Sequence, residues 1–297
     1  ALAMRFTQFS HWTCTWICTL SVGLLCFMAA SGWCQETAGQ SGKEMKAQPR
    51  CMPADRTVFQ LGGIPGEYVQ AVCDQWLKGL AERNPAILEM FADREKQPPR
   101  ELLPWSGEFA GKYLTGAVQI LRLTQNGELR EYHANFVKQF IALQAEDGYL
   151  GPWSKEYQLT GRGAKVWENY PTWDAWNHYH AMLGLMLWYE ESGDEAALQA
   201  TRKIADLLCN TFLDQPGGMT VMKACAVNHA PLHSLGILYM KHAEPHYLAL
   251  MNQIVEKEFP TEGNYVELAL AGKPMSQFPH KQETGDSDFR RWENLHI

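Results

Sequence analysis

The sequence lacks any cluster of basic residues, and this absence excludes one large class of function. Its 297 residues contain 33 Asp and Glu against 26 Lys and Arg, so the formal net charge is −7. Affinity for nucleic acid depends on Lys and Arg side chains that are grouped and neutralise several phosphates together. We therefore expect no nucleic-acid partner for this chain.

Two structural patterns are also missing. No segment alternates apolar and polar residues over the length of a strand, so we expect little sheet. The eight cysteines include no Cys-x-x-Cys pair, which argues against a zinc ribbon. The chain is 46% hydrophobic and 20% charged, a composition typical of a folded protein with a sizeable core. These features together favour a globular, mostly helical chain.

The N-terminal region is expected to precede the folded domain. Residues 6–35 carry no formal charge, and an apolar run at 16–30 ends in small residues. This is the pattern of a secretory signal peptide, and the run is shorter than the roughly 20 residues that a membrane span needs. We expect a signal peptide at residues 1–31 and a linker or surface arm at 32–64. The protein would then be exported to the periplasm or the cell exterior, without stable membrane insertion after cleavage.

From residue 65 onward, apolar residues recur at helical spacing in segments that are separated by short turns. The repeating unit is a loop with aromatic and polar residues, followed by an apolar helix, a tight turn and an amphipathic helix. This unit recurs about every 50 to 65 residues. Antiparallel helix pairs of this kind stack side by side and bury their apolar members against each other. The pattern predicts helices at residues 67–90, 111–123, 128–144, 174–191, 195–212, 224–241 and 244–257.

The expected fold is all-α, an (α/α)6 toroid of helical hairpins over residues 65–297. In such a ring the long loops before the apolar helices meet at one mouth, and the tight turns lie at the opposite end. The chain is expected to supply only about half of the pairs that close the ring. We therefore expect it to be the N-terminal part of a longer domain.

Residues 170–194 are central to this prediction. They begin with tryptophan, tyrosine, aspartate and histidine side chains and continue as an almost wholly apolar helix. Ser192 and Gly193 are expected to end that helix, and Asp194 is expected to cap the next one. The first half of the segment has the composition of a polar site walled by aromatic rings, a bias shared by clefts that stack sugars.

Several segments resemble the β-L-arabinofuranosidase-like glycoside hydrolases, family 127 and its relatives in the six-hairpin glycosidase superfamily. They are GEFAGKYL at 107–114, DGYLG at 147–151, WDAWNHYHAMLGLMLWYEESGD at 173–194, and the repeat that follows. The resemblance covers residues 65–297 and implies part of an (α/α)6 catalytic domain. It also implies a glycoside hydrolase that acts on arabinofuranosides or related plant glycans, with a carbohydrate as its partner.

The resemblance implies a metal-assisted mechanism as well. In that family a cysteine nucleophile attacks the anomeric carbon, and a zinc ion held by Glu and Cys lowers the pKa of the thiol. Glu293 falls in the metal motif and is the candidate catalytic residue, whereas Leu295 stands where the family has a cysteine. The paired cysteines would follow Ile297. We therefore assign no metal ligand here, expect zinc only in the full-length protein, and expect this chain alone to be inactive.

The remaining candidates are expected to bind the substrate, and each has a structural alternative. An aspartate before Gly-Tyr is typical of a turn, and a carboxylate at a helix start favours the helix dipole whatever its function. Aromatic residues in these loops are as typical of packing as of sugar stacking. The candidates are Glu108, Asp147, Tyr149, Trp173, Asp174, His178, His180 and His229.

The histidines differ in their expected directions. His178 and His180 are two positions apart on a helix, so their side chains point about 200° apart and at most one faces the mouth. The resemblance implies a sugar-binding histidine in this region, and the spacing to Ser192 and Gly193 favours His180 for that role. His229 precedes an apolar helix and resembles a substrate-binding histidine of the family, with a surface or capping role as its alternative.

Two other functions stay open. Unsaturated uronyl hydrolases and sugar epimerases are also helix-pair toroids, and their Asp, Glu or His acid–base chemistry without a metal would suit Leu295. A protein that binds carbohydrate without turnover would keep the toroid and lose the chemistry.

Overall fold

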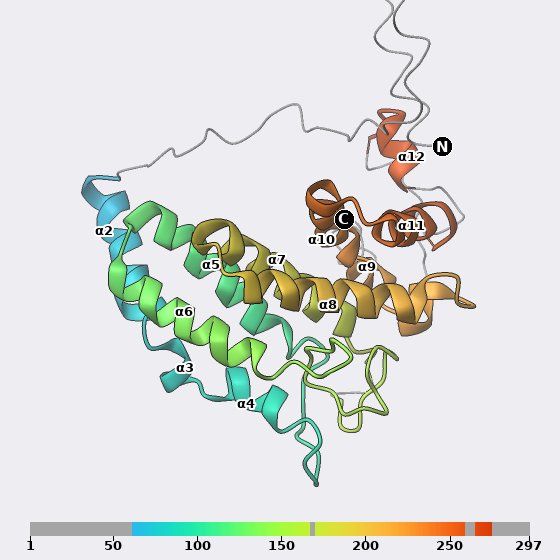
Figure 1. Cartoon of the computed structure of the whole chain (residues 1–297), viewed down its shortest axis with the longest axis horizontal. Helices are drawn as coiled ribbons and strands as arrows, with labels where there is room; N and C mark the ends of the chain where they lie inside the picture. Colours follow the sequence, from blue (N-terminus) through green and yellow to red (C-terminus); the bar gives the residue numbers. More distant parts are fainter. Residues whose placement is uncertain (1–60, 167–169, 259–264, 275–297) are drawn as a thin grey trace, which may run out of the picture. The chain divides into compact units, whose positions relative to one another are not determined.

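The computed structural model describes residues 61–166, 170–258 and 265–274, and within these ranges the chain is helical (Figure 1). The described residues contain no strand, and their one extended pairing is an isolated parallel bridge between Leu102 and Val166. The predicted all-α class is therefore confirmed. None of the described helices is long and apolar enough to cross a membrane.

Most of the helical elements follow one another with short connections, and longer loops join α4 to α5 at 93–107 and α6 to α7 at 142–173. The elements are α2 (Gly63–Ala71), the π-helical η2 (Val72–Leu77), α3 (Leu80–Arg83), α4 (Ala86–Ala92), α5 (Glu108–Thr124), α6 (Gly127–Ile141), α7 (Asp174–Ser192), α8 (Glu195–Phe212), the 3-10 helix η4 (Gly218–Met222), α9 (Cys225–Asn228), α10 (Pro231–His242), α11 (Pro245–Gln253), the π-helical η5 (Ile254–Glu258) and α12 (Tyr265–Leu270). The predicted signal peptide, most of the predicted linker and Glu293 lie outside the described residues.

Helical hairpins pack in the order that the sequence predicted. α5 contacts α7 and α7 contacts α10, whereas their partners α6, α8 and α11 contact one another in the same order. α7 is buried on most of its sides, while α8 buries one face and exposes the other. An apolar inner helix followed by an amphipathic outer helix is thereby confirmed for the hairpin α7–α8 (Figure 1).

The turn between α7 and α8 follows its local sequence signals. α7 ends at Ser192, and Gly193 adopts the left-handed region at φ 73°, which glycine enters at little cost. Asp194 then caps α8 by accepting a hydrogen bond from the Ala196 N–H at 3.0 Å. The predicted helix stop and N-cap are both confirmed.

Two predicted helices are interrupted, and these boundaries were wrong. The predicted helix at 67–90 is divided into α2, η2, α3 and α4. Gly79 adopts φ 75° between η2 and α3, and Pro85 disfavours a helical conformation of Asn84 between α3 and α4. The predicted helix at 224–241 is divided into α9 and α10. Pro231 lies at the start of α10, where its missing N–H costs nothing, whereas in the middle of a helix it would remove a hydrogen bond.

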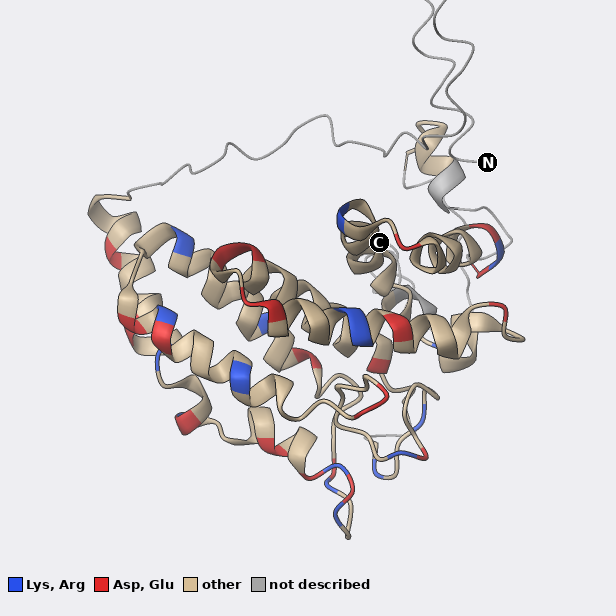
Figure 2. Cartoon of the chain, in the orientation of Figure 1, with Lys and Arg blue, Asp and Glu red and all other residues tan. Residues whose placement is uncertain are grey.

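Charged residues of both signs are interspersed along the described helices (Figure 2). Ion pairs join the hairpins near their turns: Arg122 and Arg130 contact Glu191 at 3.3 and 2.6 Å, and Lys241 contacts Glu190 at 2.7 Å. Partly exposed pairs of this kind contribute at most about 1 kcal/mol each. The stability of the array must therefore come mainly from its apolar interior.

The contact between α5 and α7 depends on two glycines. A Cβ atom on Gly111 would lie 2.3 Å from the backbone carbon of His180. A Cβ atom on Gly184 would lie 2.5 Å from the Leu114 Cβ and 2.9 Å from the Gly111 oxygen. No side chain fits at either position without moving backbone, so the two helices touch at their main chains.

We predict that Gly111→Ala lowers the free energy of unfolding by about 3 kcal/mol, because the added methyl group forces α5 away from α7. Gly116→Ala on the same helix is the matched control, since a Cβ atom there meets nothing within 4 Å. It should stabilise the protein by about 0.5–1 kcal/mol through helix propensity. Denaturant unfolding measures both, and equal effects of the two substitutions would contradict the close contact.

A second core feature is the histidine His133, which is fully buried on α6. Its ring lies 4.9 Å from the Trp188 ring and 5.8 Å from the Tyr113 ring. Neither ring nitrogen has a hydrogen-bond partner among the described residues. Burial therefore lowers the pKa of His133 from its usual 6.5 to about 4, since a charged ring would lose its hydration without compensation.

This pKa shift predicts a loss of stability in acid. Between pH 6.5 and 4 the unfolded chain binds a proton at His133 that the folded chain does not, so stability falls as the pH falls. Protonation of this one group lowers the free energy of unfolding by about 3 kcal/mol in total. His133→Phe should remove that part of the pH dependence, measured as the difference in unfolding free energy from wild type across pH. Phe136→Leu is the control and should lower the free energy of unfolding by the same amount at each pH. If the pH profile of His133→Phe runs parallel to that of wild type, the pKa of His133 is not lowered in the folded protein.

Candidate functional site

The loop before α7 is attached to the first residue of that helix. Asp174 is fully buried, and its two carboxylate oxygens accept hydrogen bonds from the Tyr149 hydroxyl at 3.1 and 3.0 Å. The Leu159 N–H donates to the same carboxylate at 2.8 Å. The Tyr149 hydroxyl in turn accepts from the Trp153 N–H at 3.2 Å. One carboxylate therefore holds both limbs of the loop.

His178 holds the loop at a second point, one helical turn later. Its Nε2 accepts the Leu150 N–H at 3.1 Å, and its Nδ1 lies 2.7 Å from the Asp174 carbonyl oxygen. Nε2 must accept because its partner is an N–H, and Nδ1 must donate because its partner is a carbonyl oxygen. The ring of His178 is therefore neutral and carries its proton on Nδ1. Asn177 adds a hydrogen bond from its side-chain N–H to the Leu150 oxygen at 2.9 Å.

Burial governs the electrostatics of this network. It raises the pKa of the Asp174 carboxyl, an effect opposed by His178 and by the hydrogen bonds from Leu159 and Tyr149. Burial also lowers the pKa of His178 and raises that of the Tyr149 hydroxyl. The guanidinium of Arg94 lies 5.7 Å from the centre of the Tyr149 ring and donates to the Gly151 oxygen. The hydrogen bonds from Tyr149 and Leu159 offset the cost of burying the Asp174 carboxylate.

These contacts show where four of the predicted site residues lie. Tyr149, Asp174 and His178 have no exposed surface in the described part of the chain, and their polar atoms bind the loop and the start of α7. In the described part of the chain the three side chains hold the loop, and their predicted contact with a sugar stays a prediction. The favoured alternative for Asp147 is observed: its Oδ1 accepts the Tyr149 N–H at 3.1 Å in a turn, and its other oxygen pairs with Lys155.

A cluster of aromatic side chains adjoins this network, and we call Trp105, Trp173, Trp176 and Tyr179 the aromatic cluster. Trp105 and Trp173 have ring centres 5.2 Å apart, and those of Trp176 and Tyr179 are 5.4 Å apart. Trp176 is buried, whereas the other rings are partly exposed. His180 lies edge-to-face against Trp176 at 4.5 Å and is itself partly exposed. The cluster thus brings the candidates Trp173 and His180 together.

Glu108 fixes the orientation of the buried ring in this cluster. The indole N–H of Trp176 donates to the Glu108 carboxylate, whose other oxygen lies 2.9 Å from the Lys112 ammonium group. That ammonium group also lies 5.6 Å from the centre of the Trp176 ring. Glu108 is buried and Lys112 is exposed, so the cation is the member of the pair that a ligand can reach.

His229 lies in a separate buried pair. Its Nε2 is 3.0 Å from the Oε2 of Glu258, and the two side chains are 1% and 5% exposed. The predicted alternative of a surface histidine is therefore wrong. Sequence reasoning missed Glu258, which follows His229 by 29 positions without any local pattern. It also missed Lys112, although the spacing of four from Glu108 on one helix was a usable signal.

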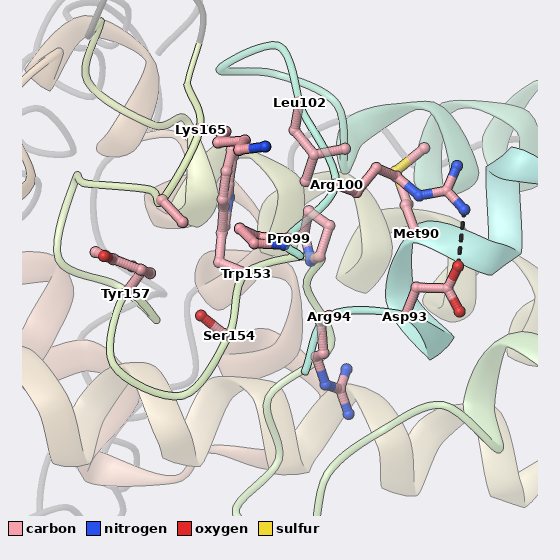
Figure 3. Close-up of a pocket in the computed structure, with 12 residues that line it drawn as sticks. Met90, Asp93, Arg94, Pro99, Arg100, Leu102, Trp153, Ser154, Tyr157 and Lys165 are labelled. Carbon is pink, nitrogen blue, oxygen red and sulfur yellow. Dashed lines mark hydrogen bonds and ion pairs between the residues drawn. The ribbon is translucent and has the colours of Figure 1, made fainter. Parts of the chain in front are cut away.

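A small pocket lies between the end of α4 and the loop that follows α6, and its lining includes Arg94 and Trp153, which contact Tyr149. Figure 3 shows the Asp93–Arg100 ion pair at the edge of this pocket and Trp153 and Tyr157 on its wall. None of the predicted site residues lines it. Trp153 is 4% exposed and belongs to this wall and to the core.

The metal ligands that the family resemblance implies are not among the described residues. Within residues 61–166, 170–258 and 265–274, no group of three or more His, Cys, Asp or Glu side chains could hold a metal ion. Glu293 lies outside these ranges. No chemical step of this site is therefore assigned to a metal.

Comparison with known proteins places the chain in one family. Residues 69–284 match the family model described as the β-L-arabinofuranosidase, GH127 catalytic domain. No match was found among curated proteins.

Solved structures show the same fold. A GH127 β-L-arabinofuranosidase from Geobacillus stearothermophilus T6 is 16% identical with a TM-score of 0.50, and the match covers 73% of this chain and 35% of that chain. A GH127 β-arabinofuranosidase is 19% identical with a TM-score of 0.51, covering 72% of this chain and 35% of that one. The chain thus spans about a third of the length of these structures. At such identities the likeness shows the fold, which agrees with the predicted (α/α)6 type.

We predict that Tyr149→Phe lowers the free energy of unfolding by about 2 kcal/mol, because a buried carboxylate loses its hydroxyl donor. The amide of Leu159 should also exchange its hydrogen faster, since the loop loses one of its attachments to Asp174. Tyr157→Phe, in the same loop, is the matched control and should change stability by less than about 0.5 kcal/mol. Denaturant unfolding and hydrogen exchange check both. Indistinguishable variants would show that the hydroxyl of Tyr149 does not hold the loop.

Proposed function

The chain belongs to the GH127 β-L-arabinofuranosidase family, and on that basis we propose that its protein is a glycoside hydrolase acting on arabinofuranosides of plant glycans. The observation that carries the proposal is the match of residues 69–284 to the catalytic-domain model. The described residues support it with a site of suitable chemistry, since partly exposed aromatic rings stack on the apolar faces of sugars while polar groups bind the hydroxyls.

The proposed roles follow from burial. Trp173 is partly exposed in the aromatic cluster and is proposed to stack on the sugar. His180 is proposed to bind a sugar hydroxyl, because its ring lies beside Trp176 and retains exposed surface. Glu108 is proposed to act through Trp176 and Lys112. The Asp174 network is proposed to hold the loop against which the sugar lies.

The chain spans about a third of the length of the GH127 structures that share its fold. Its described loops and helices carry the proposed binding residues. We propose that hydrolysis requires the complete catalytic domain. The substrate test is therefore made on the complete protein, with this chain assayed beside it.

We predict that the complete protein releases arabinose from an aryl β-L-arabinofuranoside and leaves the α-L-anomer intact. His180→Ala should lower kcat/KM by about 10- to 100-fold, the loss expected for one hydrogen bond to the sugar. His246→Ala is the control, because His246 lies on α11 against Asp206 and should leave the rate unchanged. Chromogenic assays measure all of these rates.

Three results would count against the proposal. Release of unsaturated uronic acid in place of arabinose would favour a uronyl hydrolase. Saturable binding of the arabinofuranoside in calorimetry without turnover would indicate a carbohydrate-binding protein. Equal rates for His180→Ala and His246→Ala would remove His180 from the site and leave the activity itself in place.

A further inference from the structure

Glu258 is a buried carboxylate on which several separate segments converge. Its Oε2 lies 3.0 Å from the Nε2 of His229 and accepts the Met219 N–H at 3.1 Å. Its Oε1 accepts a hydrogen bond from the Gln253 side chain at 2.7 Å. The carboxylate thus joins η4, the link between α9 and α10, the end of α11 and η5, and its side chain is only 5% exposed.

Local backbone structure creates the space for this carboxylate. α11 ends at Gln253 and continues as the π-helical turn η5, Ile254–Glu258, which ends at the carboxylate itself. A π-helical turn changes the direction in which the following side chains point, and such turns are frequent at functional sites. Gly218 lies against the carboxylate at φ 47°, and a Cβ atom there would be 2.0 Å from the Glu258 Oε1. A glycine at position 218 therefore leaves the space that the Glu258 carboxylate occupies.

The pair adjoins the aromatic cluster through the residues on either side of His229. Val227 and Ala230 pack against Trp176 in one apolar group. The side-chain N–H of Asn228 donates to the Thr172 oxygen at 3.0 Å, directly before Trp173. His229 is therefore held by its own neighbours next to the rings that we propose to bind the sugar, although it is nearly fully buried.

We propose that Glu258 is a positioning residue that fixes the ring orientation and tautomer of His229 beside the aromatic cluster. A carboxylate that accepts the Nε2 proton fixes the tautomer of a neutral ring. Because Val227 and Ala230 pack against Trp176, a fixed His229 ring also holds the segment that contacts the aromatic cluster. The role of the pair in binding rests on the proposed function, whereas the orientation of the ring does not.

The first test is made on the ring itself. In the complete protein with 15N-labelled histidine, the His229 signals, assigned by their loss in His229→Gln, should show the proton on Nε2. Glu258→Met removes the acceptor and should produce a mixture of tautomers, whereas Glu258→Gln keeps an acceptor oxygen and should retain the Nε2 proton. Gln253→Met is the matched control, because it removes a different hydrogen bond of the same carboxylate and should leave the tautomer unchanged.

The second test separates positioning from stability. Glu258→Met should lower kcat/KM on the aryl β-L-arabinofuranoside by about 10-fold, and Glu258→Gln should restore most of it. Gln253→Met should destabilise the fold, since it also contacts Phe212 and Asp214, without a comparable loss of kcat/KM.

A proton on Nδ1 in wild type, or an unchanged tautomer in Glu258→Met, would overturn the proposal. Equal kinetic losses in Glu258→Met and Gln253→Met would overturn the part that concerns binding. If the complete protein does not cleave arabinofuranosides, the proposed function fails, and the ring measurement still decides whether Glu258 positions His229.

Discussion

The main-chain contact between α5 and α7 is the constraint on which the described structure depends. Gly111 and Gly184 allow the helices to approach closely, and a methyl group at either position would meet backbone or a core side chain. This proximity lets Glu108 at the start of α5 reach the indole of Trp176 on α7. The same contact that buries α7 therefore also orients the centre of the aromatic cluster, so scaffold and site cannot be changed independently here.

Burial separates the polar residues of this region into two roles. Asp174, Tyr149 and His178 are buried, and their side chains form hydrogen bonds within the loop before α7 and between this loop and the start of α7. Trp173 and His180 keep exposed surface and are the side chains that a ligand can reach. Enclosed polar groups with complete partners rigidify a site. A rigid loop beside partly exposed rings is the arrangement from which we argue for sugar binding.

The sequence predicted the parts of the fold that depend on local signals. Apolar periodicity located the hairpins, and Gly193 and Asp194 marked their turn, because helix ends are set by neighbouring residues. The breaks near Gly79 and Pro231 were missed, since a long apolar pattern outweighed single residues. Burial of the DGYLG and α7 side chains, and the pairing of His229 with Glu258, arise from contacts between distant segments, which periodicity in one chain does not specify.

We propose that the aromatic cluster binds an arabinofuranoside. Titration of the complete protein with methyl β-L-arabinofuranoside, followed through the indole N–H signals of 15N-labelled tryptophan, tests this binding. We expect saturable shifts at Trp173 and Trp176, with Trp153 in the pocket beside α4 unchanged. Shifts confined to Trp153, or saturable binding without any change at Trp173 and Trp176, would contradict it.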